Sequence, residues 1–135
     1  MKVFIVGSSK SGKSSLSRGI ESDSTREPES FGTGLEVRTL KMAHINISLW
    51  EFDGQDEFCS TQTFFMAERA IFIVVYNTND EKEQQLENVK SWFQKIKARA
   101  PKAPVIVVGT HRDQVADEDA DRFRTAWEDN IEIIR

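Results

Sequence analysis

Three stretches of the sequence are continuously apolar, and the segments between them are patterned differently. These stretches are residues 3–6, 71–76 and 105–108. Short apolar runs bounded by polar residues are typical of strands buried on both faces of a parallel sheet. Residues 35–41 and 45–52 instead alternate apolar and polar side chains, and residues 42–44 between them predict a hairpin turn.

Two segments have helical spacing. Residues 13–20 follow a glycine-bearing segment and suit a helix, and apolar side chains recur every three or four residues between Asp80 and Pro101. Near the C-terminus, residues 123–134 also suit a helix, although Ile131 and Ile133 are compatible with the start of a strand. This alternation of strands and helices predicts an α/β domain with three layers and a mainly parallel central sheet.

Residues 21–34 are the exception to this alternation. The segment is polar, contains proline and glycine, and predicts a loop. Loops of about 14 residues are uncommon in compact domains unless they have a function. The whole chain has 135 residues, enough for one domain, so we expect residues 1–135 to form a single domain.

Composition and charge narrow the classes of function. The net charge is −4, which argues against nucleic acid as a partner. Residues 1–50 nevertheless carry seven basic and five acidic side chains, against eleven and seventeen in residues 51–135, so the basic excess lies near the N-terminus. The single cysteine, Cys59, excludes an internal disulfide, which fits a reducing, cytoplasmic location. No stretch approaches the roughly 18 apolar residues of a membrane span, and neither a signal peptide nor a lipid anchor is expected.

The first candidate site is the phosphate loop, residues 7–14, which reads GSSKSGKS and fits the pattern G-x-x-x-x-G-K-[ST]. A triphosphate needs many donors at short range, and glycines allow the main chain to approach it. The predicted helix after the loop directs its positive end to the same place. Lys13 would reach the β- and γ-phosphates, and the Ser14 hydroxyl would ligate Mg²⁺. We expect these contacts from Gly7, Ser9, Lys10, Ser11, Gly12, Lys13, Ser14 and Ser15; a Ser/Gly linker is the alternative.

The second candidate site follows an alternating strand, in residues 49–58. Glu51 would hold a water of the Mg²⁺ shell, the Gly54 N–H would bond the γ-phosphate, and Gln55 would orient the attacking water. Gln55 is therefore the candidate catalytic residue. An acidic surface turn is the alternative interpretation.

The third candidate site is the base-binding segment, residues 110–113, which follows the apolar run 105–108. The Asp113 carboxylate can accept hydrogen bonds from N1–H and the 2-amino group of guanine, a donor pair that adenine lacks. Thr110 would belong to the same site, and we expect His111 to pack under the base. An ATP-using P-loop enzyme is disfavoured on the same ground.

These three motifs, in this order and at these intervals, resemble those of Ras-like small GTPases with a P-loop. A narrower resemblance is to the Roc domain of Roco proteins, and in particular to the leucine-rich-repeat kinases. It is carried by WEFDGQDEF (50–58), FFM (64–66), IKARA (96–100) and VGTHRD (108–113), and covers residues 2 to about 130. Thr-His-x-Asp in place of Asn-Lys-x-Asp separates the Roc branch.

The resemblance implies an activity and partners. Members bind GTP and GDP with Mg²⁺, hydrolyse GTP slowly, and adjoin a dimerising COR domain and often a kinase domain. It therefore implies a guanine-nucleotide switch with protein partners and a possible homodimer. Phe64, Phe65 and Met66 beside Phe58 would be either a partner surface or core packing.

Four departures from the family pattern bear on hydrolysis and completeness. Glu51 stands where the family has Asp, and Asp53 where a small residue is usual. Gly32 occupies the place of the switch I threonine, so Thr33, one position later, is the candidate metal ligand. The last base-contacting motif is absent, so we expect a C-terminally truncated domain without the last strand and helix. The first three departures favour the alternative of a nucleotide-binding scaffold or dimerisation module with little hydrolysis, whereas Gln55 favours the switch.

Overall fold

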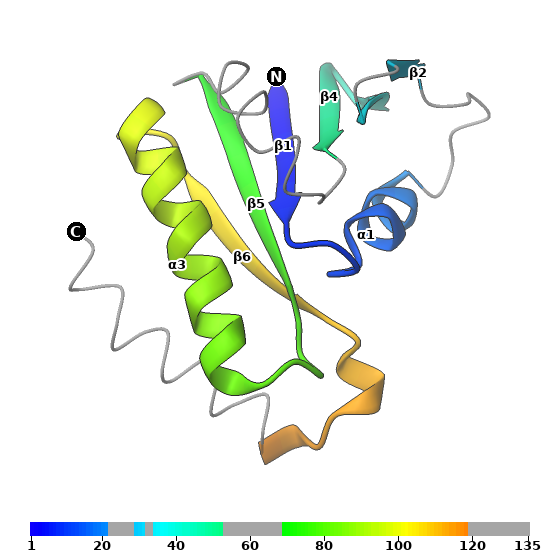
Figure 1. Cartoon of the computed structure of the whole chain (residues 1–135). Helices are drawn as coiled ribbons and strands as arrows, with labels where there is room; N and C mark the ends of the chain where they lie inside the picture. Colours follow the sequence, from blue (N-terminus) through cyan, green and yellow to red (C-terminus); the bar gives the residue numbers. More distant parts are fainter. Residues whose placement is uncertain (22–28, 32–33, 53–68, 119–135) are drawn as a thin grey trace.

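The computed structural model describes residues 1–21, 29–31, 34–52 and 69–118 (Figure 1). The elements, in chain order, are β1 (Lys2–Gly7), α1 (Lys13–Ile20), β2 (Glu29–Phe31), β3 (Leu35–Met42), β4 (Ile45–Phe52), β5 (Ala70–Asn77), α3 (Lys82–Arg99), β6 (Val105–Thr110) and the 3₁₀ helix η2 (Arg112–Gln114). The three continuous apolar runs lie within β1, β5 and β6, and the two alternating stretches form β3 and β4. The predicted helix at residues 123–134 lies outside the described residues.

The strands form one sheet in the order β2-β3-β4-β1-β5-β6. The pairs β4–β1, β1–β5 and β5–β6 are parallel, whereas β2–β3 and β3–β4 are antiparallel. The sheet is therefore parallel where its strands are continuously apolar, as predicted. Its antiparallel part consists of β2 and the predicted hairpin, whose turn is shorter than expected because β3 extends to Met42.

The prediction of an uninterrupted loop at residues 21–34 is wrong at one point. Residues 29–31 form β2, which pairs antiparallel with β3, Ser30 lying opposite Glu36. The ladder is made by main-chain groups, and these pair regardless of side-chain polarity. A polar segment therefore adds a short strand to the sheet, although its composition is typical of a loop.

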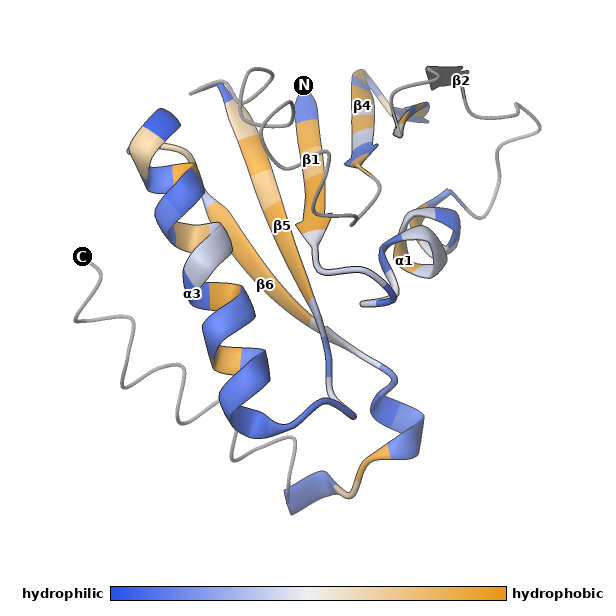
Figure 2. Cartoon of the chain, in the orientation of Figure 1, coloured by the Kyte–Doolittle hydropathy of each residue, from blue (hydrophilic) through white to orange (hydrophobic). Residues whose placement is uncertain are grey.

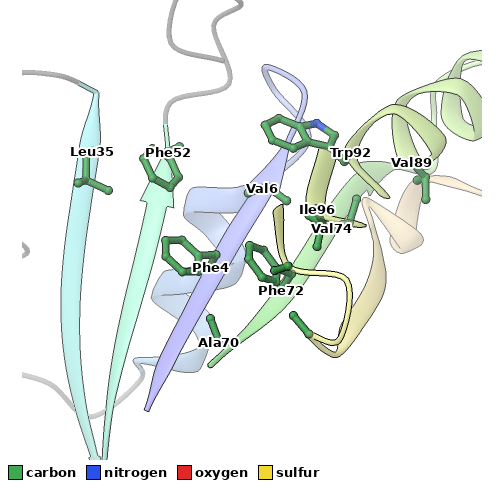
Figure 3. Packing of buried hydrophobic residues seen from close by; sticks show 12 residues of the cluster. Phe4, Val6, Leu35, Phe52, Ala70, Phe72, Val74, Val89, Trp92 and Ile96 are labelled. Carbon is green, nitrogen blue, oxygen red and sulfur yellow. The ribbon is translucent and has the colours of Figure 1, made fainter. Parts of the chain in front are cut away.

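The two faces of β1 are packed against different helices. Phe4 and Val6 belong to a cluster that includes Val89, Trp92 and Ile96 of α3 (Figure 3), and Phe4 stacks on Phe72 with 5.2 Å between ring centroids. Val3 and Ile5 face the other way, into a cluster that Leu16 of α1 covers. Alternate residues of a strand point to opposite faces, so the sheet lies between α1 and α3. The three-layer prediction is confirmed.

Hydropathy follows the same arrangement (Figure 2). Orange, apolar segments run along β1, β5 and β6, whereas α3 alternates apolar and polar residues. Among the described residues, no helix is long and apolar enough to cross a bilayer.

Candidate functional site

The phosphate loop joins β1 to α1 and requires glycine at both ends. A Cβ on Gly7 would lie 2.4 Å from the main-chain oxygen of Val75. Gly12, the residue before α1, has a left-handed φ of 89°, and a Cβ there would lie 3.0 Å from the side chain of Thr110. Glycine adopts left-handed backbone without the steric cost that a Cβ brings. The two glycines of the motif thus let the loop lie close to β5 and β6.

Lys13 lies inside the loop that precedes it. Its ammonium group donates hydrogen bonds to the carbonyl oxygens of Gly7, at 3.2 Å, and Ser8, at 2.7 Å. The residue is only 6% exposed. A buried ammonium is stable only where acceptors or opposite charges compensate for lost water. The loop carbonyls provide that compensation and hold the charge at the start of α1.

Glu51 brings a carboxylate from β4 to the same helix. Parallel pairing of β1 with β4 places Glu51 opposite Ile5, next to the end of β1. The carboxylate accepts hydrogen bonds from the hydroxyl of Ser14 and, at 2.6 Å, from the hydroxyl of Ser17. Glu51 is 6% exposed. The predicted Mg²⁺ residues Ser14 and Glu51 are therefore in direct contact.

Thr110 connects the phosphate loop to the base-binding segment. Its hydroxyl lies 2.6 Å from the carbonyl oxygen of Ser11 and 3.0 Å from that of Tyr76, either of which can accept its hydrogen, and 2.9 Å from Nδ1 of His111. Burial raises the pKa of Tyr76, whose phenol lies beside Gly109. Because the hydroxyl has one proton, it donates to one carbonyl at a time. Thr110 fixes the spacing between the two loops.

A cavity of about 530 Å³ opens where these elements meet. It is lined by Lys10, Gly12, Lys13, Ser14, Ser15, Gly34, Glu36, Glu51, Phe52 and His111. Seven of these are residues predicted from the sequence: all but Gly34, Glu36 and Phe52. The volume is within the range of small-molecule sites, about 300 to 1,000 Å³.

Other predicted residues are placed differently. Gly7 and Ser11 are buried and Thr110 is half-buried, and none of the three lines the cavity; Ser9 and Asp113 are exposed and do not line it either. Asp113 lies on η2, beside His111, whose φ of 58° is left-handed. Thr33, Gly54, Gln55, Asp53 and the FFM segment (64–66) lie outside the described residues.

Sequence reasoning missed two polar residues near the cavity. Glu36 lies opposite Glu51 in the β3–β4 ladder, so both point to the same face. The hairpin was predicted from the sequence, but Glu36 can be matched with Glu51 only when the length of the turn is known. Ser17 lies three residues after Ser14 on α1, a spacing that places the two on one helix face. Neither residue belongs to a motif, which is why both were overlooked.

Comparison with known proteins identifies the family. The family model described as "Ras of Complex, Roc, domain of DAPkinase" matches residues 2–113. The chain belongs to the Roc family. Roc domains are Ras-like GTPase domains, so the family resemblance and the P-loop fold predicted from the sequence are both confirmed.

Three relatives of this Roc domain are much longer proteins that are named as kinases. It is 30% identical over 146 residues to "Leucine-rich repeat serine/threonine-protein kinase 1" of Caenorhabditis elegans, which covers 98% of this chain and 6% of that protein. Identity to the Mus musculus protein of the same name is 27% over 127 residues, 85% of this chain and 6% of that protein. Identity to "Probable serine/threonine-protein kinase pats1" of Dictyostelium discoideum is 41% over 75 residues, 56% of this chain and 2% of that protein. The chain thus spans a small fraction of each relative.

Proposed function

We propose that this Roc domain binds GTP and GDP together with Mg²⁺, hydrolyses GTP slowly, and acts as a guanine-nucleotide switch. The observation that carries the proposal is the convergence of Lys13 with the Ser14–Glu51 pair at one cavity. A fixed cation next to a hydroxyl–carboxylate pair is the combination that a phosphate chain with a bound divalent ion requires.

The phosphate side of the site is supported by the loop conformation. Lys10 and Lys13 line the cavity together with the first residues of α1, whose unpaired N–H groups attract anions. Lys13 is already held by main-chain oxygens, so little side-chain freedom is lost when a phosphate oxygen joins them. This pre-arrangement favours an anion of several phosphates.

The proposed Mg²⁺ site is supported by the direction of the hydrogen bond between Ser14 and Glu51. The Ser14 hydroxyl donates to Glu51, which leaves its oxygen lone pairs for a cation, and oxygen ligands are those that Mg²⁺ prefers. Ser14 and Glu51 therefore fit the ion, and Thr33 is the proposed third contributor. When bound, Mg²⁺ would neutralise charge on the phosphates.

Base selection is assigned to the segment that follows β6. We assign the guanine edge to Asp113 and the space beneath the base to His111, which lines the cavity. Thr110 sets the position of both relative to the phosphate loop, through its hydrogen bond to Ser11.

A second candidate function is a nucleotide-binding scaffold with little hydrolysis, whose output is dimerisation or docking of other domains of a longer kinase chain. The observation that favours it is the pair of carboxylates, Glu36 and Glu51, facing the same cavity. Like charges near the phosphates oppose the build-up of negative charge during hydrolysis.

Titration with fluorescent GDP, GTP and ATP, with and without Mg²⁺, followed by a hydrolysis assay on the same sample, tests both candidates. We expect tight binding of both guanine nucleotides only with Mg²⁺, and measurable turnover. We expect binding of ATP to be at least about 100-fold weaker, because adenine lacks the donor pair that Asp113 is proposed to accept from. Binding without turnover selects the scaffold. Absence of guanine-nucleotide binding by folded protein refutes both.

Gln55 is proposed to orient the attacking water, and its replacement separates hydrolysis from binding. We expect Gln55→Leu to slow single-turnover GTP hydrolysis by at least about tenfold, since general acid–base and positioning effects exceed this size, with GTP affinity unchanged. Equal rates for the two proteins would remove Gln55 from the mechanism.

A further inference from the structure

Ser17 is a buried hydroxyl outside the phosphate motif that contacts the proposed metal site. It lies on α1, is fully buried, and its Oγ is 2.6 Å from Oε2 of Glu51. The same oxygen lies 3.2 Å from the carbonyl oxygen of Ser14. A hydroxyl has one proton, and the shorter bond to a charged acceptor is the stronger. The Ser17 proton is therefore directed to Glu51.

Each oxygen of the Glu51 carboxylate accepts a hydrogen bond from a different serine hydroxyl. Ser14 donates to Oε1 and Ser17 to Oε2. Within the described part of the chain, no lysine, arginine or histidine forms an ion pair with this carboxylate. A carboxylate that is 6% exposed depends on hydrogen bonds for stabilisation. Ser17 supplies one of the two.

We propose that Ser17 is a positioning residue: it orients the Glu51 carboxylate, and through it the Ser14 hydroxyl that binds the cation. By holding Oε2, Ser17 fixes the rotation of the carboxylate, so that Oε1 stays against Ser14. The Ser14 hydroxyl then keeps donating its hydrogen to Glu51, and the lone pairs of the Ser14 oxygen stay directed at the cation. This inference rests on the proposed function, because it concerns the same Mg²⁺ site.

The length of the Glu51 side chain explains why such a residue is needed. Glutamate has one more rotatable bond than aspartate, and each free rotamer costs entropy when a ligand fixes it. Partners that orient a metal ligand typically change metal affinity by about 10- to 100-fold when removed. Ser17 restricts Glu51 before the ion arrives.

The test is the Mg²⁺ concentration at which fluorescent GDP is half-maximally retained by the protein. We expect Ser17→Ala to raise this concentration about tenfold and to leave GDP binding in excess chelator unchanged. Ser17→Cys, which keeps a side chain of similar size but is a weak donor, is expected to shift it the same way and serves if the alanine variant does not fold. Ser91→Ala, on α3, is the matched control and should not shift it.

A double-mutant cycle separates positioning from general support of the fold. If Ser17 acts through Glu51, adding Ser17→Ala to Glu51→Ala leaves the half-maximal Mg²⁺ concentration of Glu51→Ala unchanged. Additive effects, or no shift in either Ser17 variant, would overturn the inference while leaving the proposed function intact. If wild-type protein retained GDP equally well without Mg²⁺, the metal part of the proposed function would fail and this inference with it.

Discussion

Replacing Lys13 with alanine is expected to weaken GDP binding by at least about 100-fold, the effect of losing one or two charge-assisted hydrogen bonds to phosphate. Lys13 is the cation held at the start of α1, and its contacts to Gly7 and Ser8 already point it into the phosphate loop. Binding is measured by calorimetry or by displacement of a fluorescent analogue.

The control for this variant is Lys90→Ala, which removes one positive charge from an exposed site on α3. Lys90→Ala has the same net charge as Lys13→Ala. Its affinity for GDP should stay within about twofold of that of the wild-type protein, because exposed charges at a distance are screened. Thermal unfolding without nucleotide shows whether the loop variant is folded. Undiminished GDP affinity in folded Lys13→Ala would refute the phosphate loop as the binding site.

Replacing Arg38 with alanine is expected to lower the free energy of unfolding by about 3 kcal/mol or more. This is the usual result of removing one partner of a buried ion pair. Arg38 on β3 pairs with Glu21, the residue after α1, and both side chains are less than 10% exposed. Burial acts to lower the pKa of Arg38, but the hydrogen bond and charge of Glu21, with those of Glu36, outweigh burial and raise it. Glu36 is 42% exposed and adds little.

Urea denaturation of Arg38→Ala and of Lys41→Ala measures this effect. Lys41 is an exposed residue of the same strand, and its replacement should change stability by no more than about 0.5 kcal/mol. Combining Arg38→Met with Glu21→Gln should recover part of the loss, because no buried charge then remains uncompensated. A loss below about 1 kcal/mol for Arg38→Ala would show that the pair is not important for stability.

The parallel strands β1, β5 and β6 were predictable because they are apolar on both faces. Val3 to Val6 form an unbroken run, and parallel strands covered by helices on both sides need one. The strand β2 was not predictable, since Glu29 and Ser30 have no β-propensity and are ordered into the sheet by main-chain pairing with β3. Local composition indicates burial, whereas pairing at a sheet edge depends on the neighbouring strand.

The site was predictable where a motif fixes the main chain. Gly12 and Lys13 belong to a motif that can be recognised by its residue types and that specifies the conformation of the loop. Both residues line the cavity. Glu36 and Ser17 reach the same region through strand register and helix rotation. The sequence shows that Ser14 and Ser17 share a helix face, but it does not show that Glu51 of β4 lies against that face. The pairing of Glu36 with Glu51 depends on the length of the hairpin turn. The Asp113 assignment stays a prediction, since that residue does not line the cavity.

Helix α1 is fastened to the β3–β4 hairpin near both of its ends. Ser14 and Ser17 bond to Glu51 of β4, and Glu21, just beyond the helix, bonds to Arg38 of β3. Because α1 is held at both ends, the contacts at one end oppose rotation of the helix about the other. A rotation of α1 away from the sheet would therefore have to break the hydrogen bonds to Glu51 at one end or the Arg38–Glu21 pair at the other.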